Sequence, residues 1–116
     1  KNLKSNSSNL LLLNLKKVIN DGTGKRAYID EIEIGGKTGT AEIWDKKNRQ
    51  YSKENYFSSF ATIFPINNPK YVMIISLEVP YNKRWGGETA APCAKNIIKN
   101  IMLYDKELRI KNHEKA

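Results

Sequence analysis

The residues with the clearest chemical potential are Lys37, Thr38, Gly39 and Thr40, which place a cation, two hydroxyls and a glycine in one short run. In a strand, Thr38 and Thr40 share a face, so both hydroxyls can point at one ligand. Gly39 leaves the backbone between them open. An ammonium group and two hydroxyls can together bind a carboxylate, and the Thr40 amide can face a developing oxyanion. The simpler interpretation of a bare Lys-Thr-Gly triplet is a surface lysine before a turn.

The rest of the sequence offers few groups for a metal centre or a catalytic triad. Cys93 is the single cysteine and His113 the single histidine, which argues against an intrachain disulfide, a multi-cysteine metal site and a Ser-His-Asp triad. We therefore predict no metal site and no cofactor. Cys93 falls on an expected helix face, where a buried, inert thiol is more common than a redox site. His113 is expected in a frayed tail.

The composition suits one domain that binds no nucleic acid. The chain has 116 residues, 40% of them apolar, and a formal net charge of +8, which can attract nucleic acid, anionic lipid or an anionic polymer. Because lysine outnumbers arginine sixteen to four, solvated surface lysines are the simpler explanation. The run of leucines at residues 10–13 is far shorter than the roughly 18 to 20 residues that span a bilayer, so we expect any membrane anchor to lie outside this chain.

Two amphipathic helices are expected, one near each end. The first starts at Leu10, where apolar residues begin to recur at three- and four-residue spacing, and should end through a left-handed glycine within residues 21–24. The second, with Pro92 in its first turn, should lie back across a sheet. Its apolar face contains Ala90, Ala94, Ile97, Ile98 and Ile101. We expect residues 1–9 to be a loose end and residues 105–116 to fray.

Three strands are expected between these helices. Ile32 and Ile34 alternate with glutamates and lead into the Lys-Thr-Gly run, and residues 56–64 and 71–79 follow, joined by a reversal rich in proline and asparagine. Residues 45–55 are charged and expected to be a hairpin loop. Short links imply an antiparallel meander. The strand at 71–79 is apolar at nearly every position, so we expect it to be central and covered on both faces. The predicted fold class is α+β.

Four ordered blocks give the chain a resemblance to class B penicillin-binding proteins, in which S-x-x-K, S-x-N and K-T-G motifs form the active site. The blocks, within residues 10–104, are Gly22-Thr23-Gly24, Gly36-Lys37-Thr38-Gly39-Thr40-Ala41-Glu42, Ser59-Phe60 followed by Pro65, and Gly86-Gly87 with Ala90-Ala91-Pro92. The chain looks most like the division-specific, FtsI-type branch, although the elongation branch shares most of these blocks. Two departures are Thr62, where the family pattern has glycine, and Cys93, where an aromatic residue often follows Ala-Ala-Pro.

The resemblance implies roles for the motif residues. Lys37 would tune the proton network of a nucleophilic serine and attract the substrate carboxylate, while Thr38 and Thr40 would hold that carboxylate or its β-lactam counterpart. No serine in this chain is followed three positions later by lysine, so we expect residues 1–116 to be the C-terminal part of a transpeptidase domain and inactive alone. Ser7-Ser8-Asn9 matches S-x-N in form, but it lies only 30 residues before Lys37, and helix capping is the simpler interpretation.

For the complete protein, the resemblance implies a serine-type peptidoglycan D,D-transpeptidase that cross-links stem peptides, is acylated by β-lactams and works with cell-division membrane proteins. It would lie at the periplasmic face of the bacterial inner membrane, anchored by an N-terminal helix. Its sheet would have five strands, so the apolar surface left uncovered here should make this chain self-associate. The alternatives are a non-catalytic penicillin-recognising sensor or scaffold of the same fold, and a basic interaction module with a chance motif match.

Overall fold

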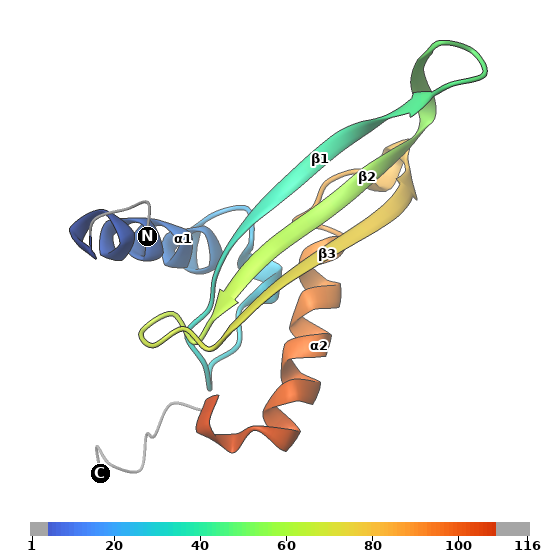
Figure 1. The fold of residues 1–116 in the computed structure, drawn as a ribbon. Coiled ribbons are helices and arrows are strands. Elements are labelled where there is room, and N and C mark those ends of the chain that lie inside the picture. Colours follow the sequence, from blue (N-terminus) through green and yellow to red (C-terminus); the bar gives the residue numbers. More distant parts are fainter. Residues whose placement is uncertain (1–4, 109–116) are drawn as a thin grey trace.

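The computed structural model describes residues 5–108 as a three-stranded sheet with two helices (Figure 1). The helices are α1 (Ser5–Asp21) and α2 (Ala90–Tyr104), and the strands are β1 (Gly35–Asp45), β2 (Gln50–Phe64) and β3 (Tyr71–Pro80). Short 3₁₀ turns are η1 (Lys25–Ala27), η2 (Tyr81–Lys83) and η3 (Lys106–Leu108). No helix in this part of the chain is long and apolar enough to cross a membrane.

The sheet is an antiparallel meander in the order β1-β2-β3, which confirms the predicted α+β class. The β1–β2 hairpin is longer than expected, because β2 begins at Gln50 and only residues 46–49 turn, rather than the whole of 45–55. Trp44 pairs with Tyr51 across the strands, with ring centroids 5.1 Å apart in an edge-to-face arrangement. Such cross-strand aromatic pairs stabilise a ladder, which explains its extension through a charged segment.

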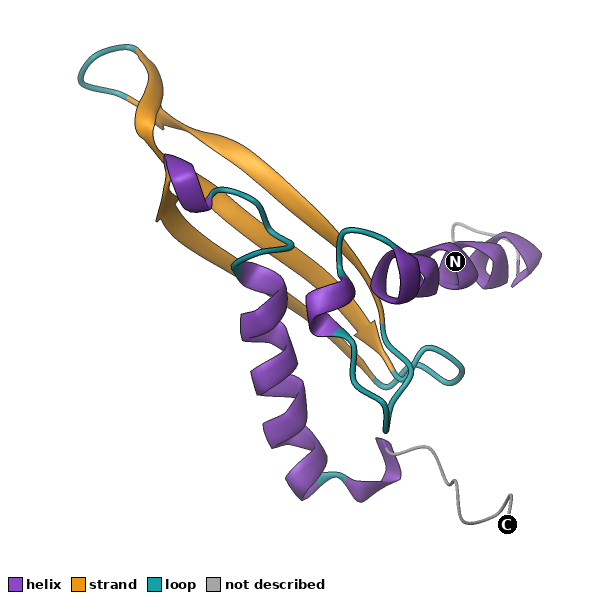
Figure 2. Ribbon diagram, turned by 180° about the vertical axis from the view of Figure 1, so that it is seen from behind, coloured by secondary structure: helices purple, strands orange, loops and turns teal. Residues whose placement is uncertain are grey.

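One face of the sheet packs against α2, as predicted (Figure 2). Phe60 and Phe64 of β2 are fully buried there. The buried side chains of α2 are Ala90, Ala91, Ala94, Ile98 and Met102. The alanines at the start of α2 let the helix approach the sheet closely, and the larger side chains fill the space farther along. Ile32 and Ile34 are buried too, although they precede β1 rather than belong to it.

The prediction that β3 is central and covered on both faces is wrong for the described chain. β3 is an outer strand of the three, and its residues alternate between half-buried and exposed. Val72 and Ile74 point away from α2 and are 74% and 69% exposed. An apolar strand alone cannot show whether one or both faces have a covering layer, because that layer comes from elsewhere. The exposed face is consistent with self-association, which stays a prediction.

The start and end of α1 also differ from expectation. α1 begins at Ser5, so Ser7, Ser8 and Asn9 lie within the helix instead of in a loose end or at its cap. Once a helix has started, each added residue gains a hydrogen bond, which extends it through neighbouring polar residues. At the other end, no described glycine has a positive φ. Gly22 and Gly24 instead donate their amides to the Val18 carbonyl oxygen at 3.1 and 3.0 Å.

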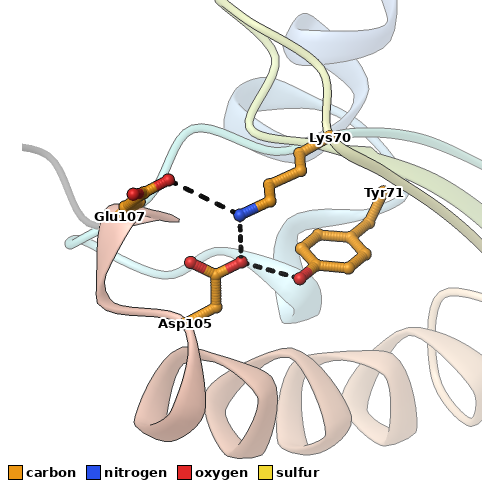
Figure 3. Close-up of polar contacts among 4 residues, drawn as sticks. All are labelled: Lys70, Tyr71, Asp105 and Glu107. Atoms are coloured by element: carbon orange, nitrogen blue, oxygen red, sulfur yellow. Dashed lines mark hydrogen bonds and ion pairs between the residues drawn. The ribbon is translucent and has the colours of Figure 1, made fainter.

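The chain beyond α2 is held to the sheet by a polar cluster (Figure 3). Asp105 Oδ2 accepts hydrogen bonds from Lys70 Nζ at 2.5 Å and from the Tyr71 hydroxyl at 2.7 Å, and Lys70 also lies 3.6 Å from Glu107. Leu108 is buried in the core. Residues 105–108 are therefore folded rather than frayed. The rest of the predicted tail, including His113, lies outside the described residues.

This cluster should make stability depend on pH. The bonds from Lys70 and then Tyr71 lower the pKa of Asp105 below its ordinary 3.8, so its stabilising effect is present above that value and is lost as the pH falls through the folded-state pKa. The bond to Asp105 raises the pKa values of Lys70 and Tyr71, so their contribution is lost at high pH, from about 10 upward. We expect Asp105→Asn to lower the melting temperature at pH 7, and this loss should shrink progressively as the pH is lowered below 3.8. A loss that stays constant as the pH falls would show that the ionised carboxylate does not stabilise the fold.

Candidate functional site

The Lys-Thr-Gly motif lies in the first half of β1, at an open edge of the sheet. β1 pairs only with β2 in the described chain, with Thr38 opposite Phe60 and Thr40 opposite Ser58. The opposite edge of β1 therefore has unpaired backbone groups along its length. Such an edge can accept hydrogen bonds from, and donate them to, a ligand that lies beside the strand.

Thr38 and Thr40 lie on the face of β1 that α2 covers farther along the sheet, as strand periodicity requires. The Thr38 hydroxyl lies 2.9 Å from the hydroxyl of Thr23, which follows α1. The Thr40 hydroxyl donates to the carbonyl oxygen of Arg84, in the loop before α2, at 3.0 Å. Each motif hydroxyl is thus oriented by a different loop, through a residue that lies 15 positions away in the chain for Thr38 and 44 for Thr40.

These two loops and β1 enclose a hollow of about 580 Å³. Both loops lie on the α2 side of the sheet (Figure 2). The lining residues of the hollow are Gly22, Thr23, Lys25, Arg26, Thr38, Gly39, Thr40, Trp85, Gly86, Gly87 and Glu88. It therefore combines three threonine hydroxyls, two cations and one carboxylate around a short stretch of open strand. Hydroxyls and cations are the groups with which proteins bind small anionic ligands.

Lys37 does not share this hollow. Its neighbours on the other face of β1 form a separate apolar groove, lined among others by Leu15, Val72 and Ile74. Its ammonium group donates to the carbonyl oxygen of Thr38 at 3.0 Å. The structure thus brings three of the four candidate residues, Thr38, Gly39 and Thr40, to one cavity, and it places Lys37 across the strand from them.

Glycines allow the two loops to pack directly onto β1. A Cβ on Gly86 would overlap the carbonyl oxygen of Ser59 and lie 2.9 Å from that of Gly39. A Cβ on Gly87 would overlap the carbonyl oxygen of Thr23. A side chain on Gly39 would lie 2.7 Å from the Ser59 hydroxyl. The contacts at positions 86 and 87 are with backbone atoms, so only glycine fits there without moving a loop, whereas the contact at Gly39 is with a side chain.

Several residues of the hollow were not assigned a role from the sequence, namely Thr23, Lys25, Arg26, Trp85 and Glu88. In the sequence, the indication that Thr23, Gly86 and Gly87 contribute to the site was that they lie in the ordered blocks shared with the family. Trp85 is held at the rim because the Arg84 guanidinium stacks between its ring and that of Tyr81, 4.2 and 3.8 Å from the two centroids.

The two departures from the family pattern have structural effects away from the hollow. Thr62 is buried, and its hydroxyl donates to the carbonyl oxygen of Gly35 at 2.9 Å, which joins β2 to the start of β1. Cys93 is half-buried on α2. Neither lines the hollow. Within residues 5–108, no three histidine, cysteine, aspartate or glutamate side chains gather to hold a metal ion.

Comparison with known proteins gives consistent matches. The model of the penicillin-binding protein transpeptidase domain matches residues 1–99. The chain is 38% identical over 97 residues to a peptidoglycan D,D-transpeptidase FtsI homologue of Chlorokybus atmophyticus, covering 83% of this chain and 14% of that protein. It is 33% identical over 89 residues to stage V sporulation protein D of Bacillus subtilis, covering 76% and 14%. The chain thus spans only about one seventh of these relatives.

Solved structures share the fold. The transpeptidase domain of the FtsI4 D,D-transpeptidase from Legionella pneumophila aligns with a TM-score of 0.71 and 30% identity, over 86% of this chain and 37% of that one. Penicillin-binding protein 3 of Mycobacterium tuberculosis, in complex with ampicillin, aligns with a TM-score of 0.78 and 27% identity, over 94% and 26%. The arrangement of sheet, helices and loops around the hollow is therefore that of a known class of domain.

Proposed function

Because this chain belongs to the transpeptidase domain family of the FtsI-type, class B penicillin-binding proteins, we propose that it forms the carboxylate-binding wall of a peptidoglycan D,D-transpeptidase. The observation that carries the proposal is the hollow beside the open edge of β1. There, Thr38 and Thr40 present two oriented hydroxyls on one face, next to backbone that glycine leaves accessible. A carboxylate at the end of an extended peptide fits this arrangement.

The proposed reaction has two steps on a serine that lies elsewhere in the full-length protein. The serine oxygen attacks the penultimate D-Ala carbonyl carbon, its proton passes through a base to the leaving amine, and the terminal D-Ala departs. An amine of a neighbouring stem peptide then attacks the acyl-enzyme, which forms the cross-link and restores the serine. Thr38 and Thr40 hold the carboxylate of the terminal D-Ala during the first step. A β-lactam acylates the same serine.

Lys37 contributes from the other side of β1. Its ammonium group lies against the Thr38 carbonyl, outside the hollow. Its proposed role is therefore in the proton network of the serine, separate from the hydroxyls that hold the carboxylate. This position gives less support to direct attraction of the substrate carboxylate, which we proposed for the same residue.

The names of the relatives support a proposal for the cellular role. Several of them are named FtsI or FtsI homologue, which supports a place in septal rather than lateral wall synthesis. We propose that the full-length protein works at the periplasmic face of the inner membrane, anchored by an N-terminal helix, together with membrane proteins of cell division.

Intact mass spectrometry after incubation with benzylpenicillin tests the proposal. We expect the full-length protein to gain the mass of one benzylpenicillin, because the β-lactam ring opens onto the serine without a leaving fragment. The 116-residue chain alone is the control, and it should remain unmodified because it has no S-x-x-K pair. Absence of an adduct on both would favour the non-catalytic sensor or scaffold.

A further inference from the structure

A carboxylate in the hollow needs a counter-charge, and Lys37 is not positioned to supply it. The Lys37 ammonium group is engaged by the carbonyl oxygen of Thr38 and lies on the other face of β1. Two other cations, Lys25 and Arg26, line the hollow together with Thr38 and Thr40. The charge and the hydroxyls that can meet one carboxylate are therefore contributed by different segments of the chain.

The turn that presents Lys25 and Arg26 is firmly held. Ala27, at the end of η1, is fully buried, and its amide donates to the carbonyl oxygen of Gly24 at 2.9 Å. Gly24 is itself buried, and a Cβ there would lie 2.9 Å from Ile19 Cδ1 and 3.2 Å from the Phe60 ring. The backbone of η1 is thus fixed between α1 and the core, and its position depends little on the two exposed basic side chains.

Neither basic side chain is neutralised by another part of the described chain. The ion pairs within residues 5–108 join Lys16 to Glu33 and Lys70 to Asp105 and Glu107, so Lys25 and Arg26 are in none of them. The hollow contains one opposing charge, that of Glu88. Two positive charges and one negative charge leave the hollow net positive, which favours an anionic ligand.

We propose that Arg26, assisted by Lys25, is the counter-ion that recognises the carboxylate of the acyl donor in this hollow. Arginine suits the task because its planar guanidinium group can give a carboxylate two parallel hydrogen bonds. Arg26 is then a specificity residue, which favours donors with a free carboxylate over neutral ones, and Glu88 weakens that preference. This inference rests on the proposed function and adds to it the source of charge recognition.

The test compares benzylpenicillin with its methyl ester, which lacks the negative charge, on the full-length protein. The measured quantity is the second-order rate constant of acylation. Arg26→Gln should lower this constant about tenfold for benzylpenicillin, since one charge-assisted pair is lost, and leave it unchanged for the ester. For benzylpenicillin, the rate constant of Arg26→Lys should lie between those of the unsubstituted protein and Arg26→Gln, because lysine keeps the charge but lacks the planar guanidinium group. Glu88→Gln should raise the constant for benzylpenicillin alone.

Lys47→Gln, in the exposed turn of the β1–β2 hairpin (Figure 1), is the control for removing one positive charge at a distance from the hollow. It should leave both constants unchanged. The inference would be overturned if Arg26→Gln lowered the acylation rate constant by the same factor for both compounds, or lowered it for neither. If the unsubstituted protein reacts with neither compound, it is the proposed function that fails, and the role of Arg26 fails with it.

Discussion

Thr40→Ala should slow acylation of the full-length protein by benzylpenicillin by about 10²-fold or more. The Thr40 hydroxyl lies in the hollow and donates to the Arg84 carbonyl oxygen, so it is already oriented and can be redirected to a bound anion with little reorganisation. A hydrogen bond to a charged group such as the substrate carboxylate contributes about 1.5–3 kcal/mol, and the upper end of this range corresponds to about 10²-fold. The rate constant can be followed by the loss of free serine, measured as adduct formation over time.

Thr40→Ser is the matched control for this effect. It keeps the hydroxyl and removes only a methyl group, so most of the rate should be retained. Because Thr40 is exposed, neither variant should unfold the protein, and equal melting temperatures would establish this. If Thr40→Ala is acylated as fast as the unsubstituted protein, Thr40 does not take part in binding the substrate.

Gly86→Ala should damage both stability and acylation. The new Cβ would overlap the Ser59 carbonyl oxygen and lie 2.9 Å from that of Gly39. Both atoms belong to the backbone of paired strands, so no rotamer change relieves the contact, and the loop must move away from β1. Overpacking of this kind typically costs about 1–3 kcal/mol. The same movement would displace Trp85, Glu88 and the Arg84 carbonyl that orients Thr40.

The measurements are the melting temperature and the acylation rate constant of the full-length protein. Gly22→Ala provides a milder comparison, since its Cβ would lie no closer than 3.1 Å to Val18, and its melting temperature should fall less. If Gly86→Ala melts at the unsubstituted temperature and reacts at the unsubstituted rate, the loop does not depend on close packing against the motif.

Local patterns in the sequence were sufficient for much of the fold. The three strands, the reversal at residues 65–69 and part of the apolar face of α2 were predicted, because periodicity and turn chemistry depend on residues only a few positions apart. The same reasoning placed Thr38 and Thr40 on one face of a strand. This local reasoning failed where a segment is stabilised by contacts with residues beyond its own local pattern. The pairing of Trp44 with Tyr51 lengthens the hairpin, and the bonds of Asp105 to Lys70 and Tyr71 fix a segment expected to fray.

The composition of the hollow was decided by the tertiary structure alone. By itself, the sequence determined that a lysine, two hydroxyls and a glycine lie together on a strand, and through its ordered blocks it determined the family. It did not show that Thr23 contacts Thr38, that Gly86 packs on Gly39, or that Arg26 shares a cavity with Thr40 while Lys37 does not. These contacts join loops from both ends of the chain. They form only when the shared core brings η1 and the start of α2 to the same face of β1, and no local spacing encodes that.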